Sequence, residues 1–122
     1  MRKRDDAGSA EEHLPLPPAT FQILLALVDK ERHGYAIMRE VTERTQGQVR
    51  LGPGTLYGSL KRLLESGLVD EGGDRVDPEL DDERRRYYRL TKFGVSVARA
   101  EARRLQAMVR SARQKKLIGA EA

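Results

Sequence analysis

Hydrophobic positions along this chain recur at helical spacing, then at strand spacing, and then at helical spacing again. Between 18 and 31 they lie on nearly every side of a predicted first helix, and such a helix has to be covered on every side. After Gly34, the residues Ile37 and Val41 lie four positions apart and predict a second helix over 35–45. Residues 49–51 alternate in polarity and predict a stub strand.

The third predicted helix spans 53–65 and carries a single apolar face. Pro53 suits a first helical position, and Gly67 suits the residue just past a helix end. Strands are expected at 67–71 and 86–90, around a turn at 72–74. In the second of these strands Tyr88 and Leu90 share the face toward the core, while the opposite face carries Arg85, Tyr87 and Arg89. This order predicts a mainly α fold with a small β-hairpin, a winged helix-turn-helix.

A long last helix is expected from position 92, with Thr91 as its cap. Its apolar residues step by three and four positions, which is a heptad repeat, at Val95, Ala98, Ala102, Leu105, Val109 and Ala112. Charged residues surround this narrow seam, so we expect a dimerisation helix; the alternative is that the seam packs on the core of its own chain. The predicted organisation is a disordered arm (1–14), a winged helix-turn-helix (15–91) and a C-terminal dimerisation helix (92–118).

Composition narrows the classes of function. The 122 residues carry a net charge of +4, with a pI near 9.6, which suits a polyanionic partner. The chain has no Cys, so it has no disulfides or thiolate metal site, and it fits a reducing cytoplasm. The longest apolar stretch, 21–28, is too short to cross a membrane. His13 and His33 are isolated from other metal ligands, and no catalytic set can be assembled, so we expect no metal, no cofactor and no enzyme.

The polar side of the third predicted helix is the candidate reading face for double-stranded DNA. Thr55, Ser59 and Arg62 can reach phosphates and base edges. Tyr57 and Lys61, four apart, either grip one phosphate or form a surface packing pair. From the hairpin, Arg84, Arg85 and Arg86 are expected to reach the adjacent backbone or minor groove.

The chain resembles the PadR family of bacterial transcriptional regulators. The likeness lies in His33-Gly34-Tyr35-Ala36-Ile37, in 53–63 (Pro-Gly-Thr-Leu-Tyr-Gly-Ser-Leu-Lys-Arg-Leu), in 67–69, and in 86–91 followed by Gly94. The resemblance implies a winged-helix repressor of the compact type, whose last helix packs on the partner's N-terminal helix. The implied dimer interface comprises Phe21, Leu24, Val95, Ala98, Ala102, Leu105 and Val109. It also implies a DNA contact for Tyr35, whose alternative role is a ring wedged into the core.

Two features depart from the family pattern. The hairpin segment 74–83 is strongly acidic, so its tip is expected to turn away from phosphates. The chain has no Trp, which makes family members that sandwich flat drugs between Trp rings a poor guide to any effector. A small apolar or aromatic effector between the first and last helices stays a hypothesis. The competing hypothesis is a winged-helix module that binds proteins rather than DNA.

Overall fold

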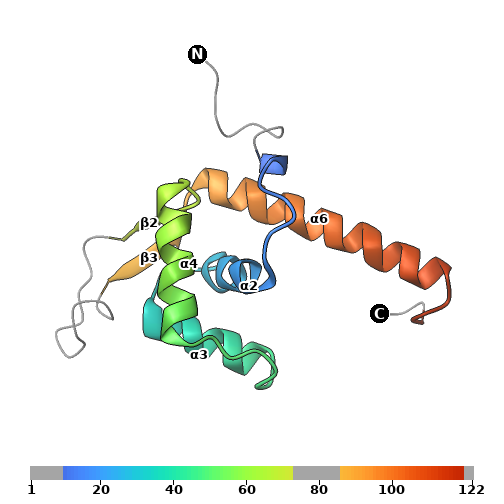
Figure 1. The fold of residues 1–122 in the computed structure, drawn as a ribbon, viewed down its shortest axis with the longest axis horizontal. Helices are drawn as coiled ribbons and strands as arrows, with labels where there is room; N and C mark the ends of the chain where they lie inside the picture. The colour runs from blue at the N-terminus through green and yellow to red at the C-terminus, as the bar shows by residue number, and fades with distance from the viewer. Residues whose placement is uncertain (1–9, 73–85, 120–122) are drawn as a thin grey trace, which may run out of the picture.

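The structure is a computed structural model that describes residues 10–72 and 86–119 (Figure 1). Its elements follow in the order α2 (Pro18–Leu27), β1 (Arg32–His33), α3 (Gly34–Arg44), α4 (Pro53–Glu65), β2 (Val69–Glu71), β3 (Tyr87–Leu90) and α6 (Lys92–Gln114). Helices dominate, and the strands form one small antiparallel sheet in the order β1-β3-β2. The predicted winged helix-turn-helix fold is confirmed. Within the described ranges no helix is both long and apolar enough to cross a membrane.

Helix α2 lies at the centre of the fold, and its own chain covers most of its apolar residues. It contacts α3, α4, α6 and β3, and Figure 1 shows it beside α4 and between α3 and α6. Leu24 is 0% exposed in the single chain. Leu24 therefore does not lie on a surface that a partner could contact, whereas Phe21 and Leu25 are half-buried and Val28 is 55% exposed. The helix also ends at Leu27 rather than near 31.

The third strand of the sheet comes from an unexpected place. Strand β1 pairs with β3, with Arg32 opposite Tyr88 and His33 opposite Tyr87, whereas the stub strand expected at 49–51 does not form. There the backbone N–H of Val49 is instead held by the Thr45 hydroxyl at 3.0 Å. The alternation of apolar and polar residues at 49–51 arises because Val49 and Leu51 pack on the core from an irregular segment, while Arg50 is exposed.

Strand β3 has the two faces that were expected. Tyr88 is buried and Leu90 half-buried, while the side chain of Arg89 is exposed. Arg89 pairs across the sheet with Asp70 on β2, with 2.7 Å between Nε and the carboxylate oxygen. Arg85 lies outside the described residues. The inner residues of β3 thus hold the sheet to the helical core.

Helix α6 is anchored where α4 turns into β2. Gly67 has φ +81° and ends α4 in a Schellman motif, in which Leu68 N–H donates to Leu63 O at 3.0 Å. The Leu68 carbonyl then lies so close to Gly94 that a Cβ there would collide with it. The Thr91 hydroxyl accepts from Gly94 N–H at 2.9 Å and caps α6. These contacts fix the direction in which α6 leaves the domain.

The chain before α2 packs on α6, so the expected disordered arm does not extend to residue 14. Residues 10–14 include a helical turn, with Ala10 buried and the His13 ring edge-on to Phe93 at 5.3 Å between centroids. The chain before α2 also covers Glu101 of α6 at Leu16, and Glu101 is only 2% exposed.

Hydrogen bonds satisfy this buried carboxylate. It accepts two hydrogen bonds from the Arg104 guanidinium, at 2.8 and 2.7 Å, and one from the backbone N–H of Leu16. The Arg104 hydrogen bonds lower the pKa of Glu101, and they outweigh the effect of burial, which acts in the opposite direction.

Candidate nucleic-acid interface

Helix α4 has one face packed in the core and one face open to solvent. Gly52 is its N-cap and Pro53 its first residue, so the helix begins as predicted. The apolar face lies against α2, α3 and β2 and consists of Leu56, Leu60 and Leu63. The open face carries Gly54, Thr55, Lys61, Arg62 and Glu65 as exposed residues, with Gly58 partly exposed among them.

Two residues expected on the reading face are turned away from it. Ser59 is 3% exposed, because a position three residues after Leu56 and one before Leu60 lies within the core-facing side of the helix. The Tyr57 hydroxyl is buried and lies against the Cα of Gly34 on α3. Neither side chain is placed to touch a phosphate, so the phosphate grip by Tyr57 and Lys61 together is wrong. Thr55, Lys61 and Arg62 do lie on the open face.

The open face of α4 carries two exposed cations, Lys61 and Arg62. Across the described ranges, neither Lys61 nor Arg62 forms an ion pair. The positive charge of this face is therefore available to an external anion.

At the base of the hairpin the positive charge is partly balanced. Arg86 lies 3.5 Å from Glu71, between guanidinium nitrogen and carboxylate oxygen, and both side chains are about half exposed. Such surface pairs are worth about 0–1 kcal/mol, so a phosphate could displace Glu71 at little cost. Arg84 and Arg85, the other predicted hairpin contacts, lie outside the described residues.

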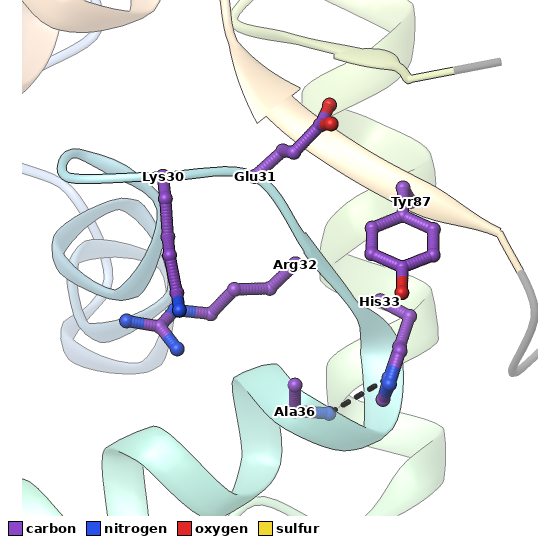
Figure 2. Close-up of a pocket in the computed structure, with 6 residues that line it drawn as sticks. All are labelled: Lys30, Glu31, Arg32, His33, Ala36 and Tyr87. Carbon is purple, nitrogen blue, oxygen red and sulfur yellow. Dashed lines mark hydrogen bonds between the residues drawn. The ribbon is translucent and has the colours of Figure 1, made fainter. Parts of the chain in front are cut away.

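The start of α3 presents an aromatic residue at the surface. His33 caps this helix, with its Nδ1 accepting from Ala36 N–H at 3.1 Å (Figure 2). Tyr35 stacks on His33, with centroids 6.4 Å apart, and is 42% exposed. It is therefore not the core wedge that was its alternative role.

A shallow pocket of about 250 Å³ adjoins this cap. Figure 2 shows the Tyr87 ring above His33, and their rings meet edge to face at 5.3 Å. Arg32 lines the pocket, but its Nε donates to the Ala26 carbonyl at 2.6 Å and its guanidinium also pairs with Asp29. That arginine supports the turn after α2 and is poorly placed to hold a ligand.

The expected dimer seam on α6 divides into a packed half and an open half. The buried residues of α6 all lie in its first ten positions, and Ala98, expected in the dimer interface, is already covered within the chain. Val95 and Phe21 are half-buried. Beyond Glu101, Ala102 and Val109 are exposed and Leu105 is partly exposed.

Sequence reasoning missed Met108, which is 54% exposed on this open half. Met108 follows Leu105 by three positions and precedes Ala112 by four, so helical spacing could have placed it on the same stripe. We call Leu105, Met108, Val109 and Ala112 the distal stripe of α6. Figure 1 shows this half of α6 extending away from the other helices.

Comparisons with known proteins agree with this architecture. The chain is similar to an uncharacterised protein X from Lysinibacillus sphaericus, with 32% identity over 72 residues, which are 59% of this chain and 63% of that protein. It spans 63% and 22% of the lengths of two curated relatives that it matches.

Two solved structures show the same fold. A transcriptional regulator from Clostridium thermocellum superposes with a TM-score of 0.66 at 18% identity, over 89% of this chain and 95% of that one. Bacillus subtilis PadR, solved in complex with operator DNA, superposes with a TM-score of 0.58 at 21% identity, over 69% of this chain and 46% of that one.

The family assignment follows from a match to a family model. A family model described as "Transcriptional regulator PadR-like family" matches residues 23–100, which is more than half of the chain and includes α3, α4, the sheet and the anchored half of α6. Members of this family are transcriptional regulators and not enzymes. This chain belongs to the PadR-like family of transcriptional regulators.

Proposed function

We propose that this protein is a homodimeric regulator that binds a two-fold symmetric DNA operator through α4 and represses transcription from it. One observation carries the proposal. The open face of α4 holds Lys61 and Arg62 with no ion pair from the described residues, on a fold shared with a regulator solved on operator DNA. Polyanion binding relieves the mutual repulsion of such cations and releases counterions from the DNA.

The proposed contacts divide into those that read bases and those that position the protein. Helix α4 enters the major groove, where Arg62 can donate two hydrogen bonds to a guanine and Thr55 can contact a thymine methyl. Lys61 contacts a phosphate. Tyr35, at the exposed start of α3, and Arg86, at the base of the hairpin, are proposed to contact phosphates beside the groove.

The proposed dimer forms through the distal stripe of α6. Met108 and Val109 are exposed large hydrophobic side chains on a helix whose buried residues all lie in its first half. A second copy of α6 packed antiparallel would cover the stripe, and its repeat of three and four positions suits helix-helix packing. Two α4 helices would then meet half-sites about 10 base pairs apart, or a multiple of that.

We also propose control by a small apolar or aromatic effector. A ligand lodged between α2 and α6 would change the separation of the two α4 helices and so the affinity for the operator. Thermal-shift screening of phenolic compounds, followed by operator release, tests it. A screen without a stabilising compound contradicts effector control.

The proposed function is tested with the full-length protein and fragments of its own genome. Fragments retained by the protein are sequenced, and binding to the enriched duplex is compared with a scrambled duplex of equal length. Preference for the enriched duplex, by a protein that sediments as a dimer at micromolar concentration, supports the proposal. Equal binding to both duplexes contradicts it and favours the protein-binding module.

A further inference from the structure

Gly58 is a residue in the interior of α4 that the fold does not explain. It lies in the middle of the helix and on its open face. Its φ lies outside the left-handed region, and the nearest atom to a Cβ built there is the Arg62 Nη1, at 3.9 Å. Glycine within a helix is less stable than alanine, because it loses more backbone freedom on folding. The chain thus carries a destabilising residue where alanine would fit.

Three other glycines of this chain are required by the folded structure itself. A Cβ at Gly34 would collide with the Tyr57 ring, and one at Gly94 would collide with the Leu68 backbone. Gly67 adopts a left-handed φ of +81°. Gly58 meets none of these conditions, so the reason for it has to lie outside the folded chain.

The residues around Gly58 indicate which external contact requires a glycine. Thr55 is three positions before it, while Lys61 and Arg62 are three and four positions after it, so all four share one face. The Arg62 side chain runs back along the helix toward Gly58, which brings its guanidinium to the middle of the open face. The glycine is therefore surrounded by the groups proposed to contact DNA.

We infer that Gly58 is the position at which the backbone of α4 comes nearest to the base edges of the operator, and that its missing side chain sets how deep Thr55 and Arg62 reach. The inference rests on the proposed DNA binding. A methyl group at position 58 would hold the helix axis farther from the groove floor. Side chains that reach bases would lose contact, whereas Lys61, which reaches outward to a phosphate, would keep its contact.

The test is Gly58→Ala in the full-length protein. We expect the melting temperature to rise by about 3 to 6 °C, so the variant is folded. Binding to a duplex enriched from genomic fragments by the wild type should weaken by at least about tenfold, the scale of one base contact. Binding to a scrambled duplex, and the slope of affinity against salt, should stay as in the wild type. Ala107→Ser, on the exposed side of α6, is the control and should change neither affinity.

Three results would overturn the inference. The first is unchanged binding of Gly58→Ala to the enriched duplex, and the second is an equal loss on both duplexes. The third is the absence of any further loss of affinity when Gly58→Ala is combined with Arg62→Ala. That result would mean that the glycine serves only to position the Arg62 side chain. None of these affects the proposed function, which fails separately if the wild type itself prefers no fragment.

Discussion

The phenol of Tyr57 lies directly over the Cα of Gly34. A Cβ at position 34 would collide with the Tyr57 hydroxyl and would lie 2.8 Å from its ring carbon Cζ. Gly34 is the first residue of α3 and Tyr57 lies in the second turn of α4, so this contact joins the two helices of the helix-turn-helix. Gly34 is required for close approach of these helices, and its backbone φ is not in the left-handed region.

The first prediction concerns this contact. Gly34→Ala should destabilise the protein by about 1–3 kcal/mol, the usual cost of overpacking, because the added methyl pushes α4 away from α3. Urea unfolding measures the change. Gly54→Ala is the matched control, since a Cβ there meets nothing within 4 Å, and it should leave stability equal or higher. Equal stability of Gly34→Ala and the wild type would show that the contact does not limit the packing.

The second prediction concerns the buried carboxylate of Glu101. Its pKa in the folded protein is lowered from the ordinary 4.5, chiefly by hydrogen bonds from Arg104, so the ionised form stabilises the fold above that pH. This contribution is lost as the pH falls from about 4.5 through the lowered value. Glu101→Gln should therefore be less stable than the wild type at pH 7, and the gap in melting temperature should narrow below pH 4.5.

A surface carboxylate provides the control for that experiment. Glu43 pairs with Arg39 at 3.6 Å, but both side chains are more than 60% exposed. Glu43→Gln should change the melting temperature little at any pH, because exposed pairs contribute little. A gap for Glu101→Gln that stays constant with pH would contradict the predicted linkage.

The third prediction separates the two cations of α4. Lys61→Ala should weaken binding to every duplex alike and reduce the slope of affinity against salt by about one. Arg62→Ala should instead cost about 1–3 kcal/mol on the enriched duplex and relax the preference at one base pair. Binding titrations at several salt concentrations, with single-base variants of the duplex, distinguish the two. The same salt slope in Lys61→Ala as in the wild type would remove Lys61 from the phosphate contacts.

The fourth prediction tests the distal stripe of α6. Leu105→Glu places a charge at the centre of the proposed dimer contact, where its burial without a partner is costly. We expect monomers in sedimentation experiments at micromolar concentration, with at least about tenfold weaker operator binding. Ala107→Glu introduces the same charge on the other side of the helix and should leave the dimer intact. Dimers that persist in Leu105→Glu would place the interface elsewhere.

Local signals in the sequence were enough for the elements and their order. Pro53 and Gly67 mark the two ends of α4, and Thr91 marks the start of α6, each through backbone groups within a few residues. The prediction of strands was less accurate where the two strands of a pair lie far apart in the sequence. Strand β1 has two residues, and it exists because β3, more than fifty positions later, passes beside it.

The candidate site was predicted in outline and corrected in detail. Helical periodicity placed Thr55, Lys61 and Arg62 on the open face, but it could not show how wide the covered face would be. Ser59 is covered because α4 is packed by several elements at once. The burial of Glu101 was not predicted, because it depends on hydrogen bonds from Arg104 and from the Leu16 backbone, which folds over the carboxylate.

The helices, the paired strands, the excess of positive charge and the likeness to a family of regulators could all be predicted from the amino-acid sequence, because each depends on spacing, caps or composition within a short window. Only the tertiary structure decided which polar side chains are left to meet a partner. Tyr57 faces Gly34 rather than solvent, and Leu24 faces its own core rather than a second subunit. Burial is a property of everything that surrounds a residue, and those surroundings come from distant segments whose final placement no local pattern contains.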